Sequence, residues 1–465
     1  MSIAWLCLVK NKWPIRPTRG DSRIPPPVAQ SPTGKKTLAR TLAPGGNPYH
    51  PERLANLTQS GIPLTSEPST PNPLPAGRSP EGLYLHLPFC FHKCHYCDFF
   101  SVVESEGAQS PRQDAFAEAL MRELDHQAAR HTLRPRTVFV GGGTPTYLRQ
   151  DLWERLLAKM NTLGMLEKVE EFTVEANPET VTPELALCLA EGGVNRVSIG
   201  AQSFNKTALK TLERWHDPDS VPRAMDTFRA AGITNINLDL IFAIPGQTLE
   251  TLDDDLRRLV ELAPSHLSTY GLTYEPNTAL SARLKAGRVT PIGEDLEREM
   301  FAHTLATLEA AGFKHYEVSN WAKTDGDRDL RCAHNLMYWR NRDWLGCGPA
   351  AASHLGGTRW KNAPNLPRYL DGSPTPPIED WECLPADRRI GEELMLGLRL
   401  SEGVALPWLE QTLGDGGKSA KRRLAAIADM ERIGMLERVP AFAATHLRLT
   451  RQGLFVADAV IGKLV

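Results

Sequence analysis

The chain has 465 residues, 41% of them hydrophobic, so it is long enough for two or three domains with cores of their own. Eight cysteines are too few for a disulfide scaffold, and no run approaches the roughly 18 to 20 consecutive apolar residues of a membrane span. The formal net charge of −2 hides an asymmetry, since residues 1–80 hold ten basic and three acidic residues and the remainder carries −9. These properties favour a cytoplasmic protein without an integral membrane span and without a nucleic-acid partner.

Residues 1–80 also hold 15 of the 36 prolines and show no sustained period of 2 or 3.6. This composition predicts a disordered, Pro-rich leader. Residues 1–9 are apolar enough to suggest a targeting signal, but they are short and no basic region precedes them. We therefore interpret the leader as a dispensable tail and expect the folded part to begin at residue 81.

From residue 81 to about 275, short apolar runs alternate with longer amphipathic runs. The short runs, typical of strands, are 83–87, 137–140, 172–175, 196–199, 236–242 and 267–272. The longer runs, typical of helices, are 114–129, 152–163, 183–191, 206–214, 221–231 and 249–262. Six strand–helix repeats at this spacing predict parallel strands joined by right-handed crossovers. The predicted fold class is therefore α/β, an open or closed barrel.

Three thiols follow the first predicted strand: Cys90, Cys94 and Cys97 are separated by three and then two residues. A structural zinc site takes four ligands, and an electron-transfer 4Fe–4S cluster takes four cysteines, so three thiols leave one metal position open. The spacing thus predicts a reactive metal centre rather than a structural one. A zinc site is the alternative, with a fourth ligand from His86, His92 or His95.

Glycines, carboxylates and amides follow the other predicted strands. In a parallel barrel the carboxyl ends of the strands meet at one edge, where the chemistry is carried out. The residues at these positions are Gly141, Gly142, Gly143, Glu175, Asn177, Gln202, Asn237, Asp239 and Glu275. The sequence therefore predicts one polar rim that includes the cysteine loop.

The cysteine loop and this rim resemble the radical S-adenosylmethionine (SAM) superfamily, and in detail its oxygen-independent coproporphyrinogen III oxidase group. The segments that carry the resemblance are 84–90, 141–148, 174–178, 198–203 and 237–241. The similarity covers about four-fifths of the chain in several ordered motifs. It implies a partial (β/α)6 TIM-like barrel over residues 81–312, a 4Fe–4S cluster on the three cysteines, and SAM at the open iron.

The resemblance also implies which residues contact SAM. Tyr96 would offer its ring to the adenine, and Gly142 and Gly143 would let the backbone approach the methionine moiety. The other implied contacts are Tyr84, Thr144, Glu175, Gln202, Arg214 and Asp239. Taken singly, each of these residues has an ordinary alternative role in a turn, a helix cap or a packed core. One departure is Glu213, which stands where the family often has glycine.

Two further features favour one branch of this group. The oxidases carry another cysteine two residues after the third cluster ligand, where this chain has Phe99. Residues 316–321 and the His-Asn-Leu-Met-Tyr-Trp motif at 334–339 resemble the HemW branch, the heme chaperones. This implies a protein that binds heme and passes it to an unidentified acceptor protein, with an electron donor such as a flavodoxin or ferredoxin.

His334 is the heme ligand we expect, since a neutral imidazole is a common axial ligand. A hydrogen-bonded link between domains is the alternative role for this histidine. Cys332 and Cys347 are poorer candidates. Catalytic residues beyond the cluster are not assigned.

The helical and strand pattern changes near residue 385. After a connecting region at 313–385, residues 386–465 predict two helices, 388–400 and 420–434, a hairpin from 435–439 and 447–450, and a last helix from 452. This order is typical of a winged-helix-like module, which makes the second half an α+β extension. Its mixed charge favours docking over DNA binding. Two other functions stay open: oxidative decarboxylation of coproporphyrinogen III, and a cluster-containing DNA-binding regulator.

Overall fold

The computed structural model describes residues 74–104, 110–414, 416–441 and 444–465, and a twelve-stranded sheet forms its centre. Six parallel strands lie side by side in chain order, which are β1 (Gly82–Leu87), β4 (Thr137–Gly142), β5 (Glu171–Ala176), β6 (Arg196–Gln202), β7 (Asn235–Phe242) and β8 (His266–Gly271). Every residue of β1, β4 and β6 is buried, as expected for strands covered on both faces. The six predicted strands are confirmed.

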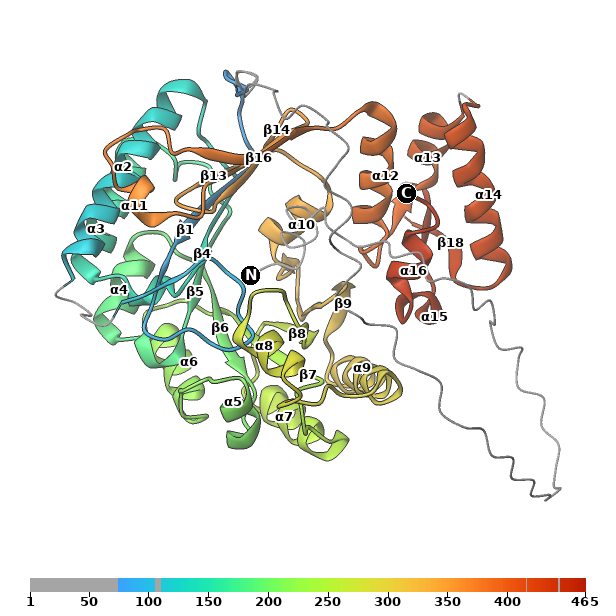
Figure 1. Cartoon of the computed structure of the whole chain (residues 1–465), viewed down its shortest axis with the longest axis horizontal. Helices are drawn as coiled ribbons and strands as arrows, with labels where there is room; N and C mark the ends of the chain where they lie inside the picture. Colours follow the sequence, from blue (N-terminus) through green and yellow to red (C-terminus); the bar gives the residue numbers. More distant parts are fainter. Residues whose placement is uncertain (1–73, 105–109, 415, 442–443) are drawn as a thin grey trace, which may run out of the picture. The chain divides into compact units, whose positions relative to one another are not determined.

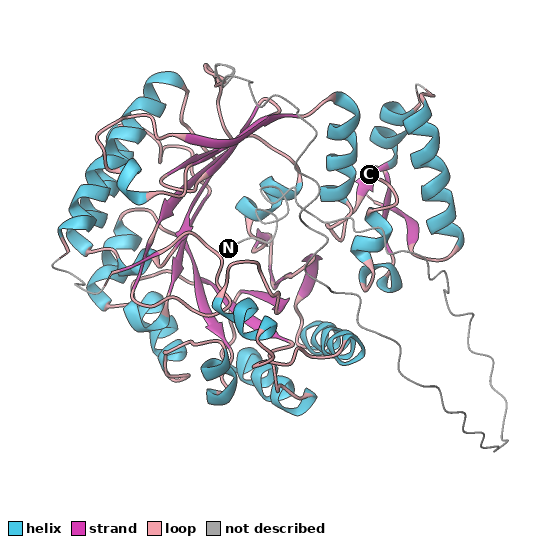
Figure 2. Ribbon diagram, in the orientation of Figure 1, coloured by secondary structure: helices cyan, strands magenta, loops and turns pink. Residues whose placement is uncertain are grey.

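Helices follow the strands and cover the outer side of the curved sheet (Figure 2). They are α2 (Pro111–Arg130), α3 (Gln150–Thr162), α4 (Pro183–Glu191), α5 (Lys206–Thr211), α6 (Ser220–Ala230) and α7 (Leu249–Glu261). Side-chain caps begin several of them: Thr182 accepts from the N–H of Leu185 at α4, and Thr248 accepts from that of Thr251 at α7. The alternation of strand and helix confirms the partial barrel.

Strands that the sequence analysis did not predict extend both edges of the barrel. Next to β1 lies β13 (Trp344–Cys347), which is parallel to it, followed by the antiparallel β14 (Ala352–Leu355), β15 (Thr358–Asn362) and β16 (Ile378–Cys383). Next to β8 lie the antiparallel β10 (Asn320–Ala322) and β9 (Lys314–Glu317). The connecting region therefore completes the sheet rather than only linking two domains.

A short buried helix, α10 (Ala333–Trp339), carries the His-Asn-Leu-Met-Tyr-Trp motif and lies within the curve of the sheet (Figure 1). Its neighbours are the first residues of barrel strands, because Thr137 of β4 and Glu171 of β5 both hydrogen-bond to it. The helices before it are α8 (Ala279–Lys285) and α9 (Glu294–Ala310). Thus α10 closes the barrel at the amino ends of the strands.

The last part of the chain has a hydrophobic core of its own, which includes Leu394, Leu409, Ile427 and Leu447. Its elements are α12 (Ala386–Gly397), β17 (Val404–Ala405), α13 (Leu406–Leu413), α14 (Lys418–Arg432), β18 (Leu436–Pro440), β19 (Thr445–Leu449), α15 (Arg451–Leu454) and α16 (Ala457–Ile461). The three strands form a sheet in the order β17, β19, β18. The winged-helix-like arrangement is as expected, with β17 and α13 in addition.

Most of the predicted leader, residues 1–73, lies outside the described residues. The described end of it packs on the barrel: Leu74 contacts the main core, and the Gly77 N–H donates to the carbonyl of Arg130 at 2.8 Å. The folded part therefore begins before residue 81. Within the described part of the chain, no helix is both long and apolar enough to cross a membrane.

Candidate functional site

The three cysteines lie on one loop at the carboxyl end of β1. Cys90 belongs to β2 (Phe89–Cys90), which pairs with β3 (Val102–Val103), so the two short strands hold the ends of the loop together. The middle of the loop is anchored by His95, whose N–H donates to the carbonyl of Leu212 at 3.1 Å and whose carbonyl accepts from Leu280 at 2.8 Å. All three thiols are free of disulfide bonds. The loop is therefore a fixed carrier of three thiols.

Burial opposes the ionisation of two of these thiols. The pKa of Cys97 is raised to about 12, mainly by burial and to a lesser degree by Cys94 and Cys90, although Lys93 acts in the opposite direction. Burial likewise raises the pKa of Cys90, against a hydrogen bond from the Thr144 hydroxyl at 3.5 Å. Since thiolates are the ligands of iron, cluster binding has to displace these protons.

The donor set suits an iron–sulfur cluster in its chemistry, because three thiols that influence one another electrostatically lie on one loop. Among the described residues, no three side chains of His, Cys, Asp or Glu stand in the geometry of a bound metal ion.

Arg214 contacts this loop from a separate segment of the chain. Its guanidinium contacts the Cys94 sulfur at 3.8 Å, donates to the carbonyl of Gly200 at 2.9 Å, and lies 3.2 Å from Nδ1 of His216. The structure thus gives Arg214 a contact to the cysteine loop in addition to the SAM contact expected from the sequence.

Glu213, the departure from the family pattern, has a φ of 53°. This left-handed conformation suits glycine, which explains why glycine is expected at this position. The side chain turns outward, where it accepts from the Trp215 indole N–H at 3.2 Å. The substitution therefore leaves Arg214 in place at a local cost in backbone strain.

Two glycines after β4 are required by close packing. At Gly142, with a φ of 111°, a Cβ atom would lie 2.7 Å from the ring of His86. At Gly143 it would lie 2.6 Å from the carbonyl oxygen of Phe89. The N–H of Gly142 donates to the Glu175 carboxylate at 3.2 Å. The structure thus brings Gly142, Gly143, Thr144 and Glu175 beside the cysteine loop, as the sequence predicted.

The strands further along the barrel carry the other expected contacts. Gln202, at the end of β6, has a φ of 64° and accepts from the Tyr270 hydroxyl at 3.1 Å. Asp239 in β7 accepts from Asn237 at 2.7 Å and from Ser198 at 3.3 Å. Left-handed residues outside glycine often mark functional sites. Tyr270 and Ser198 were not predicted as site residues, although Ser198 begins the segment 198–203 that carries the family resemblance.

Tyr84 and Tyr96 are placed differently from each other. Tyr84 is buried in β1 with its hydroxyl 3.1 Å from Nδ1 of His86, and its ring stacks on Phe139. Tyr96 is half-buried and packs against a hydrophobic cluster that includes Leu212 and Leu280. Tyr96 therefore lies at the rim, whereas Tyr84 lies in the wall of the barrel.

Two of the three histidines proposed for a zinc site, His86 and His95, contact other groups, whereas Nε2 of the third, His92, is buried without a hydrogen-bond partner. The ring of His86 is hydrogen-bonded at both nitrogens, to the Tyr84 hydroxyl and to the Phe100 carbonyl at 2.8 Å, and burial lowers its pKa to about 4. Nδ1 of His95 lies 3.1 Å from the Arg283 guanidinium. If His86 were a fourth metal ligand, it would have to give up one of these two hydrogen bonds. This favours a metal centre held by the three cysteines alone, with one metal position open.

His334 is buried at the opposite end of the barrel strands from the cysteine loop. Its Nδ1 lies 2.8 Å from the Thr137 hydroxyl and its Nε2 lies 2.9 Å from the Tyr338 hydroxyl. Burial lowers the pKa of His334 to about 3, so the imidazole is neutral, the form that binds iron. Ligation of heme by His334 would require one hydroxyl to move away.

Phe99 occupies the position where the oxidases have a further cysteine. Its side chain is partly buried against a hydrophobic cluster that includes Leu336, Tyr338 and Trp344, so Phe99 packs beside α10. An internal cavity among the barrel strands, lined by Arg196, Asp239, Tyr270, Asn320, Asn335 and neighbours, measures about 20 Å³.

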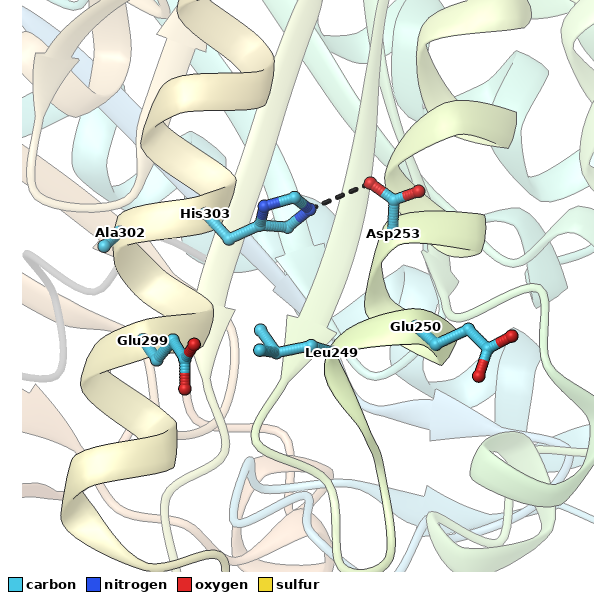
Figure 3. A pocket seen from close by; sticks show the side chains of 6 residues that line it. All are labelled: Leu249, Glu250, Asp253, Glu299, Ala302 and His303. Carbon is cyan, nitrogen blue, oxygen red and sulfur yellow. Dashed lines mark hydrogen bonds and ion pairs between the residues drawn. The ribbon is translucent and has the colours of Figure 1, made fainter.

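A larger concavity of about 420 Å³ lies between α7 and α9 (Figure 3). Its polar lining is mainly acidic, with Glu250, Asp253 and Glu299, and the ring of His303 pairs with Asp253 at 2.9 Å. None of the predicted site residues lines it. It is separate from the rim that carries the cysteine loop.

Two family profiles match the chain: the radical SAM superfamily at residues 84–259 and the HemN C-terminal domain at residues 384–456. A Mycobacterium tuberculosis (strain H37Rv) protein named heme chaperone HemW is 36% identical over 403 residues, covering 85% of this chain and 97% of that protein. The Bacillus subtilis (strain 168) protein of the same name is 33% identical over 388 residues, covering 82% and 98%. This chain belongs to the HemW family.

The fold of this HemW family member is also that of a solved oxidase. The structure titled as coproporphyrinogen III oxidase (HemN) from Escherichia coli, a radical SAM enzyme, superposes with a TM-score of 0.68 over 84% of this chain and 90% of that one, at 23% identity. The predicted membership of the radical SAM superfamily and of its HemW branch is confirmed. The HemN C-terminal domain match agrees with the predicted C-terminal module.

Proposed function

We propose that the chain is a heme carrier: it binds heme and transfers it to an acceptor protein, with a 4Fe–4S cluster on Cys90, Cys94 and Cys97. The observation that supports this most strongly is the loop of three free thiols at the rim of a radical SAM barrel, in a chain whose relatives are named heme chaperones. The free thiols also suit a reducing compartment such as the cytoplasm. A flavodoxin or ferredoxin is the class of electron donor that would fit.

When bound, the cluster and SAM supply a one-electron cleavage of a sulfur–carbon bond. The residues around them would bind and orient SAM. Glu175 and Asp239 provide carboxylates at the rim, which suit ammonium and hydroxyl donors, and Arg214 offsets negative charge at Cys94. Tyr96, Gly142, Gly143, Thr144 and Gln202 complete the proposed SAM site, with Tyr84 in the barrel wall behind them.

We propose His334 as the axial ligand of heme in the loaded state. The neutral imidazole supports this assignment, since only that form offers a lone pair to iron. The hydrogen bonds to Thr137 and Tyr338 occupy both ring nitrogens, so one of the two hydroxyls has to move away before iron is bound.

The experiment uses anaerobically reconstituted full chain, mixed with SAM and with either heme or coproporphyrinogen III. A stable heme Soret band without decarboxylated product is the expected result. Release of a vinyl-bearing product without stable heme binding would instead identify an oxidase and overturn the proposal. Recording 5′-deoxyadenosine in the same samples tells whether SAM is consumed.

The oxidase is the second candidate, and one observation weighs against it. Phe99 packs against the core around α10, so the position of the expected cysteine has a structural role in this chain. Decarboxylase activity of the unaltered chain, with Phe99 in place, would favour the oxidase, whereas activity that appears only in Phe99→Cys would favour the carrier.

A further inference from the structure

An exposed pair of aromatic rings lies beside the cysteine loop. Trp215 is 64% exposed and Phe91 is 57% exposed, whereas the other large exposed hydrophobic side chains in the described ranges are aliphatic. The two rings meet edge to face, with centroids 6.4 Å apart. Exposed aromatic residues that lie together are characteristic of binding surfaces.

The pair is fixed to the loop that carries the thiols. The Trp215 ring stacks on His92, with centroids 4.3 Å apart and an angle of 18° between the planes, and Phe91 also meets Tyr147 edge to face at 6.3 Å. Phe91 and His92 directly follow Cys90, and Trp215 directly follows Arg214, which contacts Cys94. One face of Trp215 is thus covered by His92, and the other stays open.

Two cavities of the described chain are poor sites for heme. The internal cavity of about 20 Å³ has room for about one water molecule. The concavity of about 420 Å³ between α7 and α9 is lined by three carboxylates, which would repel the propionates of heme. Neither of these two cavities suits a flat, apolar, anionic ligand, whereas the exposed aromatic pair offers ring faces on the outer surface.

We propose that Trp215 and Phe91 form the surface on which the flat face of heme rests while α10 stays closed. This inference depends on the proposed function, since it names the site where the cargo first binds. A porphyrin face can stack on the open side of Trp215 and contact the edge of Phe91. Asp217, two residues after Trp215, lies 3.8 Å from Lys206, which is 80% exposed, and a propionate could take the place of Asp217 in this ion pair. The propionates have to point away from Glu213, whose carboxylate accepts from the Trp215 indole N–H.

The test removes axial ligation first. Heme is titrated into the full chain carrying His334→Ala, and the Soret band gives the affinity; the titration is repeated with Phe91→Ala and Trp215→Ala added. Losing both rings is expected to weaken the remaining binding roughly tenfold or more, since aromatic stacking and burial of this size correspond to about that factor. Trp215→Phe is expected to restore most of the affinity.

Leu187→Ala is the matched control, because Leu187 is 51% exposed on α4 of the same barrel. It should leave heme affinity within about twofold, a difference below 0.5 kcal/mol. Because both aromatic side chains are exposed, the variant that lacks both rings should still fold. Its urea unfolding midpoint, compared with that of the His334→Ala chain, checks this. If it does not fold, Trp215→Ala is tested without Phe91→Ala.

Three results would overturn the inference. Equal heme affinity with and without the two rings would do so, as would a His334→Ala chain that binds no heme. Unchanged heme affinity with slower reduction by a flavodoxin would assign the surface to a protein electron donor instead. If the unaltered chain binds no heme, both this inference and the proposed function fail.

Discussion

Glu171 fastens α10 to the barrel, so its removal should loosen the helix that carries His334. The carboxylate is 7% exposed and accepts from the N–H groups of Ala333 at 2.8 Å and His334 at 3.0 Å. The side chain of Cys332, at the N-cap of α10, makes no capping hydrogen bond. The buried Arg196 also interacts electrostatically with Glu171.

The expected loss follows from these contacts. An unpartnered buried N–H costs about 1–3 kcal/mol, and removing one member of a buried charge pair costs about 3–5 kcal/mol. Because these effects overlap, we expect Glu171→Ala to lower the free energy of unfolding by about 3–5 kcal/mol. Glu171→Gln keeps one acceptor oxygen and should lose less.

Urea unfolding of the apoprotein measures this loss. Glu170→Ala is the matched control: the neighbouring carboxylate is 60% exposed and pairs with Arg136 on the surface, which is worth about 0–1 kcal/mol. A Glu171→Ala chain as stable as the Glu170→Ala chain would refute the view that Glu171 holds α10 in place.

Two further predictions concern buried groups. Burial raises the pKa of Glu123 from its ordinary value of 4.5 to about 7. Protonated Glu123 therefore stabilises the folded chain fully below pH 4.5, and this contribution to the free energy of unfolding is lost as the pH rises through 7. Relative to Glu123→Gln, the unaltered chain should therefore lose up to roughly 3 kcal/mol between about pH 4.5 and 8, and a constant difference in urea unfolding would contradict this. Tyr338→Phe removes the hydroxyl that lies 2.9 Å from Nε2 of His334. Heme should then bind a few-fold more tightly, because a hydrogen bond of about 1 kcal/mol no longer competes with iron for this nitrogen. Soret titrations that give an unchanged heme affinity would contradict the assignment of His334 as the ligand.

The barrel could be predicted from the sequence because its strands are short apolar runs between amphipathic helices. Strand β13 was missed because it has only four residues and is held by pairing with β1, which lies far earlier in the chain. Its partner cannot be inferred from local periodicity. The same non-local pairing places the connecting region in the sheet.

The cysteine loop could also be predicted, since thiol spacing is a local property. The hydrogen bonds of His334 could not, because Thr137 comes from a strand almost two hundred residues earlier. Glu213 shows the reverse case: the sequence marked it as a departure, and its φ of 53° gave the physical reason. The aromatic pair of Phe91 and Trp215 likewise required the fold, because the two residues lie on separate loops.

Electron paramagnetic resonance of the reduced, anaerobically reconstituted chain tests the central claim most directly. We predict the signal of one 4Fe–4S cluster, a change in that signal when SAM is added, and loss of the cluster in Cys94→Ser but not in Cys188→Ser, whose thiol lies on α4. A full cluster in Cys94→Ser, or a signal that SAM leaves unchanged, would contradict the account.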